Sequence, residues 1–199
     1  MYDYGRRMNA IRVTDPEVMW ALAHPTRLSL LGQLRTRGAA TVGQLAAATG
    51  QAVGSVSYHL RALAAHGLVI EAPDRARDRR ERWWQAAHAT TDFEPADVRG
   101  DAAGEAAMLA LRRSIIQTYA RGLEAALEYE RELPPEWLAA QAGGDDLVHL
   151  TAGEAAELRA ELEELVGRWA ARGAAARPGT EPVWLIYQAV RRAEVVAEP

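Results

Sequence analysis

The sequence predicts a mainly α-helical protein with one small β-hairpin, and two observations carry this prediction. Apolar residues recur at helical spacing in several segments that begin at a capping residue or a proline. The short apolar run at residues 68–70 is followed by a Pro-Asp turn and a segment that contains two adjacent tryptophans, which is the pattern of paired strands. Charge is also divided, because residues 1–100 carry 13 arginines and 10 acidic residues, whereas residues 101–199 carry 10 and 17.

The N-terminal segment, residues 1–14, is expected to form a loosely held arm. Asp15 and Pro16 then begin the first helix, as N-cap and first helical residue. Pro25 begins a second helix, because proline is poorly accommodated inside one. Gly38 ends this second helix, since glycine is the favoured residue after a helix.

Two further helices are predicted between Thr41 and Gly67. Thr41 caps the first of them, which ends at Gly50, and the second follows after a tight turn. Apolar residues spaced by three, four and three positions predict the buried face of the second helix: Val53, Val56, Leu60 and Leu63. Gly67 ends that helix, and residues 68–70 form a strand whose partner is residues 81–85.

The tip of this hairpin is rich in arginine. Four of its arginines are candidate contacts to a nucleic-acid backbone: Arg75, Arg77, Arg79 and Arg80. Residues 20–88 as a whole carry 9 arginines and 4 acidic residues, which suits binding to a polyanion. The alternative interpretation is a charged hairpin that is simply solvated.

Helix, turn, helix and basic hairpin in this order predict a winged helix-turn-helix domain over residues 15–89. In such a domain the second helix enters the major groove, and its outward face here carries Ser55, Ser57 and Tyr58 as candidate contacts to base edges. Gln51 and Arg61 are candidate contacts to the DNA backbone. Two alternatives remain open. Ser55 or Ser57 could instead cap the helix, since serine is a common cap residue. His59 lies beside the buried face, where packing within the fold explains it better than contact with DNA.

The second half of the chain is expected to be mostly helical. Residues 90–100 lack periodicity and are predicted to form a linker to a region that spans residues 101–199. This region contains a helix at about residues 104–132 and another that begins at the capping box of Thr151 and Glu154. Residues 183–190 favour a strand over a short helix. We expect this region to mediate dimerisation through its wide apolar stripes.

The same region contains aromatic residues that suit a pocket for a small apolar effector. They are Tyr119, Tyr129, Trp137, Trp169, Trp184 and Tyr187. The alternative is that these residues belong to the hydrophobic core, which is the commoner role of aromatic residues at helical spacing.

Several classes of protein are disfavoured by the sequence. The chain has no cysteine, which excludes disulfides and thiolate metal sites, and we predict no metal site and no cofactor. Asp145, Asp146 and His149 form the one compact cluster of metal-ligand type, and a loop with a helix cap explains it better. No catalytic or phosphate-binding motif is present, so we do not expect an enzyme. No apolar run is long enough to span a membrane, and we expect a cytoplasmic protein.

Three segments together resemble the ArsR/SmtB-like winged-helix regulators. They are LAHPTRLSLLGQL, TVGQLAAATG and SVSYHLRALAAHGLV, followed by a charged hairpin that ends in RWWQ. The resemblance covers about residues 15–88. It implies a homodimer that binds palindromic operators in double-stranded DNA, mostly as a repressor that an effector releases. It also places Ser55, Ser57 and Tyr58 at the DNA-reading positions and residues 77–80 at the wing tip.

This chain departs from the metal-sensing members of that family. Their cysteine-rich motif falls at residues 42–47, which here read VGQLAA, so a metal inducer at that position is excluded. The sequence therefore predicts a DNA-binding transcriptional regulator, a homodimeric repressor released by a non-metal effector. The alternative is a winged-helix module that binds other proteins and not DNA.

Overall fold

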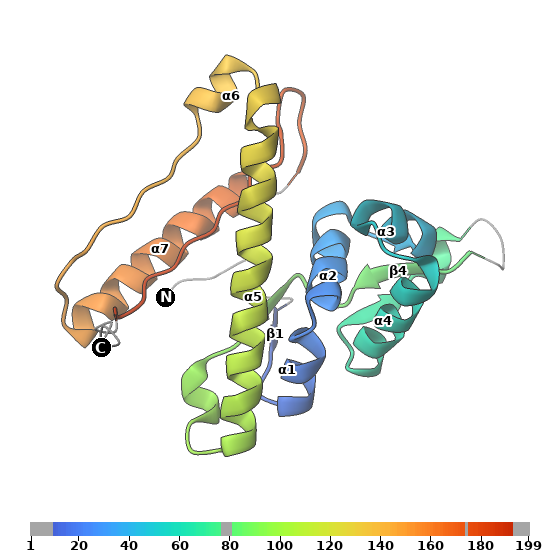
Figure 1. The fold of residues 1–199 in the computed structure, drawn as a ribbon, viewed down its shortest axis with the longest axis horizontal. Helices are drawn as coiled ribbons and strands as arrows, with labels where there is room; N and C mark the ends of the chain where they lie inside the picture. Colours follow the sequence, from blue (N-terminus) through green and yellow to red (C-terminus); the bar gives the residue numbers. More distant parts are fainter. Residues whose placement is uncertain (1–9, 77–80, 174, 193–199) are drawn as a thin grey trace, which may run out of the picture. The chain divides into compact units, whose positions relative to one another are not determined.

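The computed structural model describes residues 10–76, 81–173 and 175–192. The fold is mainly helical with two small sheets, as predicted (Figure 1). The described residues form two compact units that divide between Leu133 and Pro134. No helix among the described residues has both the length and the apolar character needed to cross a lipid bilayer.

The first unit begins with four helices, α1 (Pro16–Leu22), α2 (Pro25–Arg37), α3 (Val42–Thr49) and α4 (Val53–Ala65). The predicted caps are confirmed, since Asp15 accepts a hydrogen bond from the backbone N–H of Glu17, and Thr41 makes a capping box with Gln44. Gly50 follows α3 with a left-handed backbone (φ 65°), a conformation that glycine adopts without steric cost.

A three-stranded antiparallel sheet packs against these helices, with strand order β2 (Ala40–Thr41), β4 (Trp83–Ala86), β3 (Val69–Glu71). The predicted hairpin is therefore present as β3 and β4, while β2 is too short to show a pattern in the sequence. Pro73 begins a short 3₁₀-helix, η2 (Pro73–Arg75), where the sequence predicted a turn. Trp84 is buried and Trp83 is half-exposed, as alternation along a strand requires.

The predicted linker at residues 90–100 is wrong. These residues form β5 (Thr90–Asp92) and the 3₁₀-helix η3 (Pro95–Val98), and β5 pairs in parallel with β1 (Ala10–Arg12), within the predicted N-terminal arm. Arg12 makes a bidentate ion pair with Asp97 (Nη2–Oδ1 2.7 Å, Nε–Oδ2 2.9 Å), and Val13 and Val98 are buried. A strand of three residues is too short to show an alternating pattern in the sequence, and its partner lies far away along the chain.

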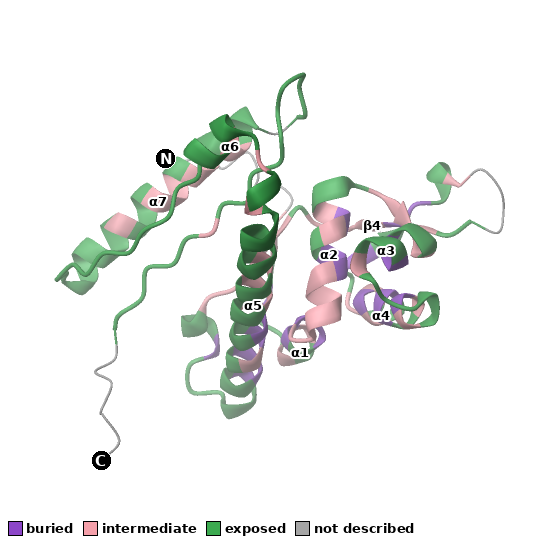
Figure 2. Cartoon of the chain, turned by 45° about the horizontal axis from the view of Figure 1, so that its top comes forward, coloured by how far each residue is buried: buried purple, intermediate pink, exposed green. Residues whose placement is uncertain are grey.

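Helix α5 (Ala102–Tyr129) follows, capped by Asp101, and its first half completes the core of the first unit. Its buried residues are Gly104, Ala107, Met108, Leu111 and Ser114. Figure 2 shows that buried residues gather on α1 to α4 and on the first half of α5. The short helix η4 (Glu130–Glu132) ends the unit.

The second unit contains α6 (Pro135–Ala139) and α7 (Ala152–Arg172). The predicted capping box of Thr151 and Glu154 is confirmed at the start of α7. Residues 175–192 contain no helix or strand, so the strand favoured at residues 183–190 is wrong. A strand needs a neighbour to satisfy its backbone hydrogen bonds, and no strand among the described residues pairs with this segment.

Candidate nucleic-acid interface

Helices α3 and α4 form a helix-turn-helix held by a short, well-determined turn. The backbone N–H of Gln51 donates to the carbonyl oxygen of Ala46 (3.2 Å), directly after the left-handed Gly50. Leu45 and Ala46 of α3 belong to the same buried cluster as the inward face of α4. The turn and the shared core therefore fix α4 against α3.

Helix α4 has one buried face and one exposed face. The buried residues are Val56, His59, Leu60 and Leu63. On the opposite face Tyr58 is 68% exposed, and Gly54 and Arg61 are also exposed. Ser55 and Ser57 are half-buried on the two flanks, and Gln51 is exposed just before the helix. All five predicted contact residues thus lie outside the core, within reach of a ligand along one helix.

The predicted burial of Val53 is wrong, because this residue is 59% exposed. At about 100° per residue, Val53 lies at the edge of the buried face of α4, between Leu60 and Ser57. It is also the first residue of the helix. The regular apolar spacing in the sequence did not show that this end of the helix has no partner.

The start of α4 has no side-chain cap. Its N-cap is Ala52, and no side chain hydrogen-bonds to the first backbone N–H groups, so the alternative in which a serine caps this helix is wrong. Helices α1, α2, α3, α5 and α7 each have a side-chain cap. Uncapped N–H groups at a helix N-terminus are oriented to bind an anion such as a phosphate.

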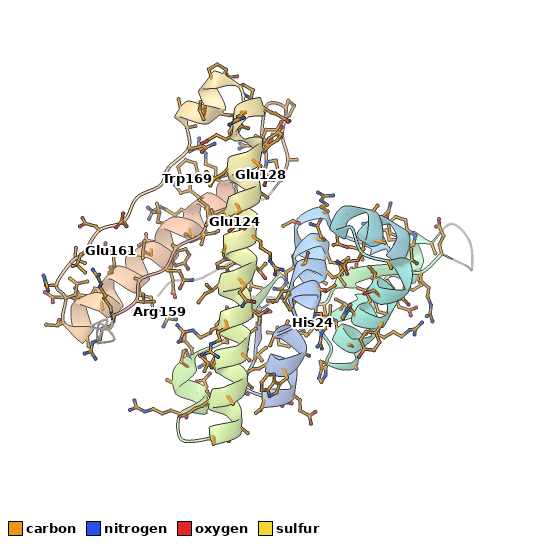
Figure 3. All side chains as sticks on the ribbon, in the orientation of Figure 1. His24, Glu124, Glu128, Arg159, Glu161 and Trp169 are labelled. Carbon is orange, nitrogen blue, oxygen red and sulfur yellow. The ribbon has the colours of Figure 1, made fainter. Side chains whose placement is uncertain are left out.

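His59 lies in the core, as the sequence suggested, and contacts a second histidine. Its ring centroid is 4.4 Å from that of His24, the N-cap of α2, and 5.2 Å from that of Tyr58. Figure 3 labels His24 where α1 meets α2. Burial lowers the pKa of both histidines, and the pKa of each is lowered further by nearby Arg27. The histidine pair thus links α4 to α2.

The hairpin carries part of the predicted basic surface. Arg75 is exposed at the end of η2, whereas Arg77, Arg79 and Arg80 lie outside the described residues. At the base of the hairpin Arg82 lies 3.5 Å from Glu71 (Nη2–Oε1), which joins β4 to β3. The Nε1–H of Trp83 donates to Glu81 (3.1 Å). The Arg82–Glu71 ion pair therefore connects the two segments of the hairpin.

Arg35 is a structural residue that sequence reasoning missed. From α2, its Nε donates to the carbonyl oxygen of His88 (3.0 Å) and its Nη2 to Thr91 Oγ1 (2.7 Å). Burial lowers the pKa of this guanidinium. The contact fixes the segment that connects the hairpin to β5, and an arginine in a helix pattern gives no sign of such a distant partner.

The six aromatic residues of the predicted effector pocket are divided between the two units. Tyr119 and Tyr129 lie on α5, whereas Trp137 lies on α6, Trp169 on α7, and Trp184 and Tyr187 in the irregular segment beyond. Tyr119 and Trp137 are half-buried and the other four are exposed. Arg172 lies over the Trp169 ring, 4.9 Å from its centroid to Cζ. The pocket stays a prediction.

Asp145, Asp146 and His149 are exposed residues in the irregular segment before α7. Asp146 Oδ1 accepts a hydrogen bond from the backbone N–H of Leu147 (2.7 Å). Among the residues that the structure describes, no three histidine or acidic side chains are grouped so that they could hold a metal ion.

Comparison with known proteins supports the helix-turn-helix. Residues 22–71 match a protein family described as a helix-turn-helix domain, which is related to the ArsR-type winged-helix regulators. No curated protein sequence matches the chain. The matched range runs from the last residue of α1 through α2, α3 and α4 to the last residue of β3. The chain therefore contains a helix-turn-helix domain at residues 22–71.

Proposed function

We propose that this protein is a sequence-specific, double-stranded DNA-binding transcriptional regulator of the ArsR-like type. The observation that carries the proposal is the two-sided character of α4. One face is anchored in the core by Val56, Leu60 and Leu63, and the other presents Tyr58 and Arg61 to solvent. A recognition helix needs this combination of a rigid support and an accessible face.

The roles of the contact residues follow from their positions. Ser55, Ser57 and Tyr58 lie in the first half of α4, from which side chains meet base edges in the major groove. Gln51 and the uncapped start of α4 suit a phosphate, and Arg61 suits another. The wing arginines Arg75, Arg77, Arg79 and Arg80 add affinity that depends on salt and not on sequence.

The regulator is proposed to act as a homodimer on a palindromic operator. The second half of α5 carries apolar side chains that its own unit leaves exposed, among them Ile116, Leu123 and Leu127. A second copy of the chain is the occupant that a two-fold operator requires, because each copy supplies one recognition helix to one half-site. Repression, with release by a non-metal effector at the aromatic residues of the second half, completes the proposal.

A salt titration of DNA binding tests this function. The full chain is mixed with the duplex that it selects from a random-sequence pool and with an unrelated duplex, at several salt concentrations. We expect tighter binding to the selected duplex, and a logarithm of affinity that falls linearly with the logarithm of salt concentration. Weak binding that is indifferent to salt would contradict the proposal and favour a protein-binding module.

Two variants separate the proposed roles within the same assay. Tyr58→Ala should cost about 1–3 kcal/mol on the selected duplex and little on the unrelated one. Arg75→Ala should weaken binding to both duplexes about equally. It should also reduce the slope of log affinity against log salt concentration by about one, the value for one phosphate contact. Equal effects of the two variants on both duplexes would contradict the assignment of roles.

A further inference from the structure

Val53 is an exposed apolar residue at the functional end of α4. It is the first residue of the helix, and the residue is 59% exposed. The first residues of a recognition helix are those that come nearest to base edges in the major groove. If α4 binds DNA as proposed above, on which this inference rests, Val53 lies among the residues that meet the bases.

The neighbours of Val53 allow close approach to a groove. Ala52 and Gly54 flank it, and a Cβ at Gly54 would meet nothing within 4 Å. Ser57 lies one turn further along the same flank, and Tyr58 lies on the exposed face. No bulky side chain next to Val53 in the sequence therefore holds the start of the helix away from its ligand.

The chemistry of valine selects one base. Its side chain has no hydrogen-bond donor or acceptor, and it is branched at Cβ, which restricts it to few rotamers. In the major groove guanine, adenine and cytosine present polar edges, which an apolar side chain would bury without a partner at a cost. Thymine alone presents an apolar group there, its 5-methyl.

We propose that Val53 contacts the 5-methyl group of a thymine, and that this contact makes a T·A pair part of each half-site opposite the start of α4. The contact buries about one methyl group against the two methyl groups of the valine. Its expected contribution to affinity is therefore about fourfold at each half-site, the value for removing one such group from water.

Deoxyuridine provides the test, because it differs from thymidine in the 5-methyl group alone. The probe is the duplex that the full chain selects from a random-sequence pool, with each symmetry-related pair of thymines replaced in turn by deoxyuridine. Four-way comparison of the wild type and Val53→Ala on the thymine and deoxyuridine duplexes measures the coupling between side chain and methyl group. Val148→Ala is the matched control, since Val148 is 56% exposed but lies in the second unit.

For one pair of thymines we expect deoxyuridine to weaken wild-type and Val148→Ala binding by about fourfold per half-site. Val53→Ala should bind the thymine duplex more weakly and lose nothing further with deoxyuridine. Deoxyuridine losses of equal size in the wild type and Val53→Ala, or no loss at any thymine, would overturn this inference and leave the DNA-binding function standing. Absence of salt-dependent binding to any duplex would instead overturn the proposed function itself.

Discussion

The two compact units of this chain contain the same kind of amphipathic helix but differ in what the helices bury. In the first unit the apolar faces of α1, α2, α4 and the first half of α5 share one core. In the second unit no described residue is buried, although α7 carries a regular apolar stripe that includes Leu158 and Leu162. An amphipathic period thus predicts a helix, whereas burial depends on a partner that the period does not identify.

Helix α5 shows this difference within one element. Leu111 in its first half is 1% exposed, and Leu127 in its second half is 66% exposed, although both are leucines of the one helix that the sequence predicts at about residues 104–132. Figure 2 shows the change from buried to exposed residues along the helix. Helix α5 packs on α1, α2 and η3, and all of its buried residues lie in its first half.

The largest expected effect comes from removing a side chain from the packed half of α5. Leu111→Ala should lower the free energy of unfolding by about 2–5 kcal/mol, because it leaves a cavity in the core. Urea denaturation followed by circular dichroism measures this change. The same substitution at Leu127 is the matched control.

Leu127→Ala should change the free energy of unfolding of the monomer by less than about 0.5 kcal/mol, since the side chain is exposed within its own unit. If the second half of α5 joins two copies as proposed, this variant should instead weaken dimerisation in sedimentation equilibrium. A Leu127→Ala protein with the oligomeric state of the wild type would contradict that interface.

A second expected effect compares glycines in the first turns of α5 and α7. At Gly104, a Cβ would lie 2.7 Å from Asp101 Oδ2 and 2.9 Å from Val98 Cβ. Gly104→Ala must therefore displace η3 or the cap of α5, and we expect a loss of about 1–3 kcal/mol in the free energy of unfolding. Thermal denaturation monitored by circular dichroism checks the sign as well as the size.

The pair of buried His59 and half-buried His24 predicts a pH dependence that belongs to the first unit alone. Because burial lowers the pKa of His24 and His59, the folded protein binds fewer protons than the unfolded chain just below the ordinary histidine pKa of about 6.5. The two histidines therefore leave the free energy of unfolding unchanged above the ordinary histidine pKa. They lower it as the pH falls from there through their lowered pKa values. Chemical denaturation at several pH values between roughly 7.5 and 5.5 measures the slope.

His59→Gln should flatten this slope, because it removes one of the two groups. His149→Gln is the control, since His149 is exposed in the second unit. A slope that is the same in the wild type and His59→Gln would show that the histidine pair does not cause it.

The smallest expected effect has the opposite sign. In the first turn of α7, a Cβ at Gly153 would meet only Thr151 Oγ1, at an ordinary contact distance of 3.9 Å. Gly153→Ala should therefore raise the stability of α7 by about 0.5–1 kcal/mol, by reducing the entropy of the unfolded chain. Increased helix content with the α5 region unchanged, measured by hydrogen exchange, is the expected result. Destabilisation would mean that this helix end is packed after all.

Local features of the sequence predicted the parts of the fold that depend on neighbours along the chain. Asp15, Thr41 and Thr151 each accept a hydrogen bond from a backbone N–H two or three residues later, so a short motif suffices to predict the helix start. The alternation that buries Trp84 and leaves Trp83 half-exposed is local in the same sense.

Contacts between distant residues were not predictable in this way. Arg35 with Thr91, and Arg12 with Asp97, join segments far apart in the sequence, and neither side of each pair forms a motif. The prediction that Val53 is buried was wrong for a related reason. Its spacing matches the buried face, yet whether anything covers the first turn of α4 depends on the surrounding structure.

The sequence by itself determined the helices, their caps, the hairpin and the helix-turn-helix order, because these follow from backbone hydrogen bonding and from side-chain period. It also determined which residues of α4 are available to a ligand at its exposed centre, notably Tyr58 and Arg61. The tertiary structure alone decided that residues 10–12 and 90–98 pair and pack as part of the first unit, that the buried residues of α5 lie in its first half, and that Val53 is exposed. Each of these depends on which surfaces pack together, and the pattern of residues along one segment does not identify the segment that packs against it.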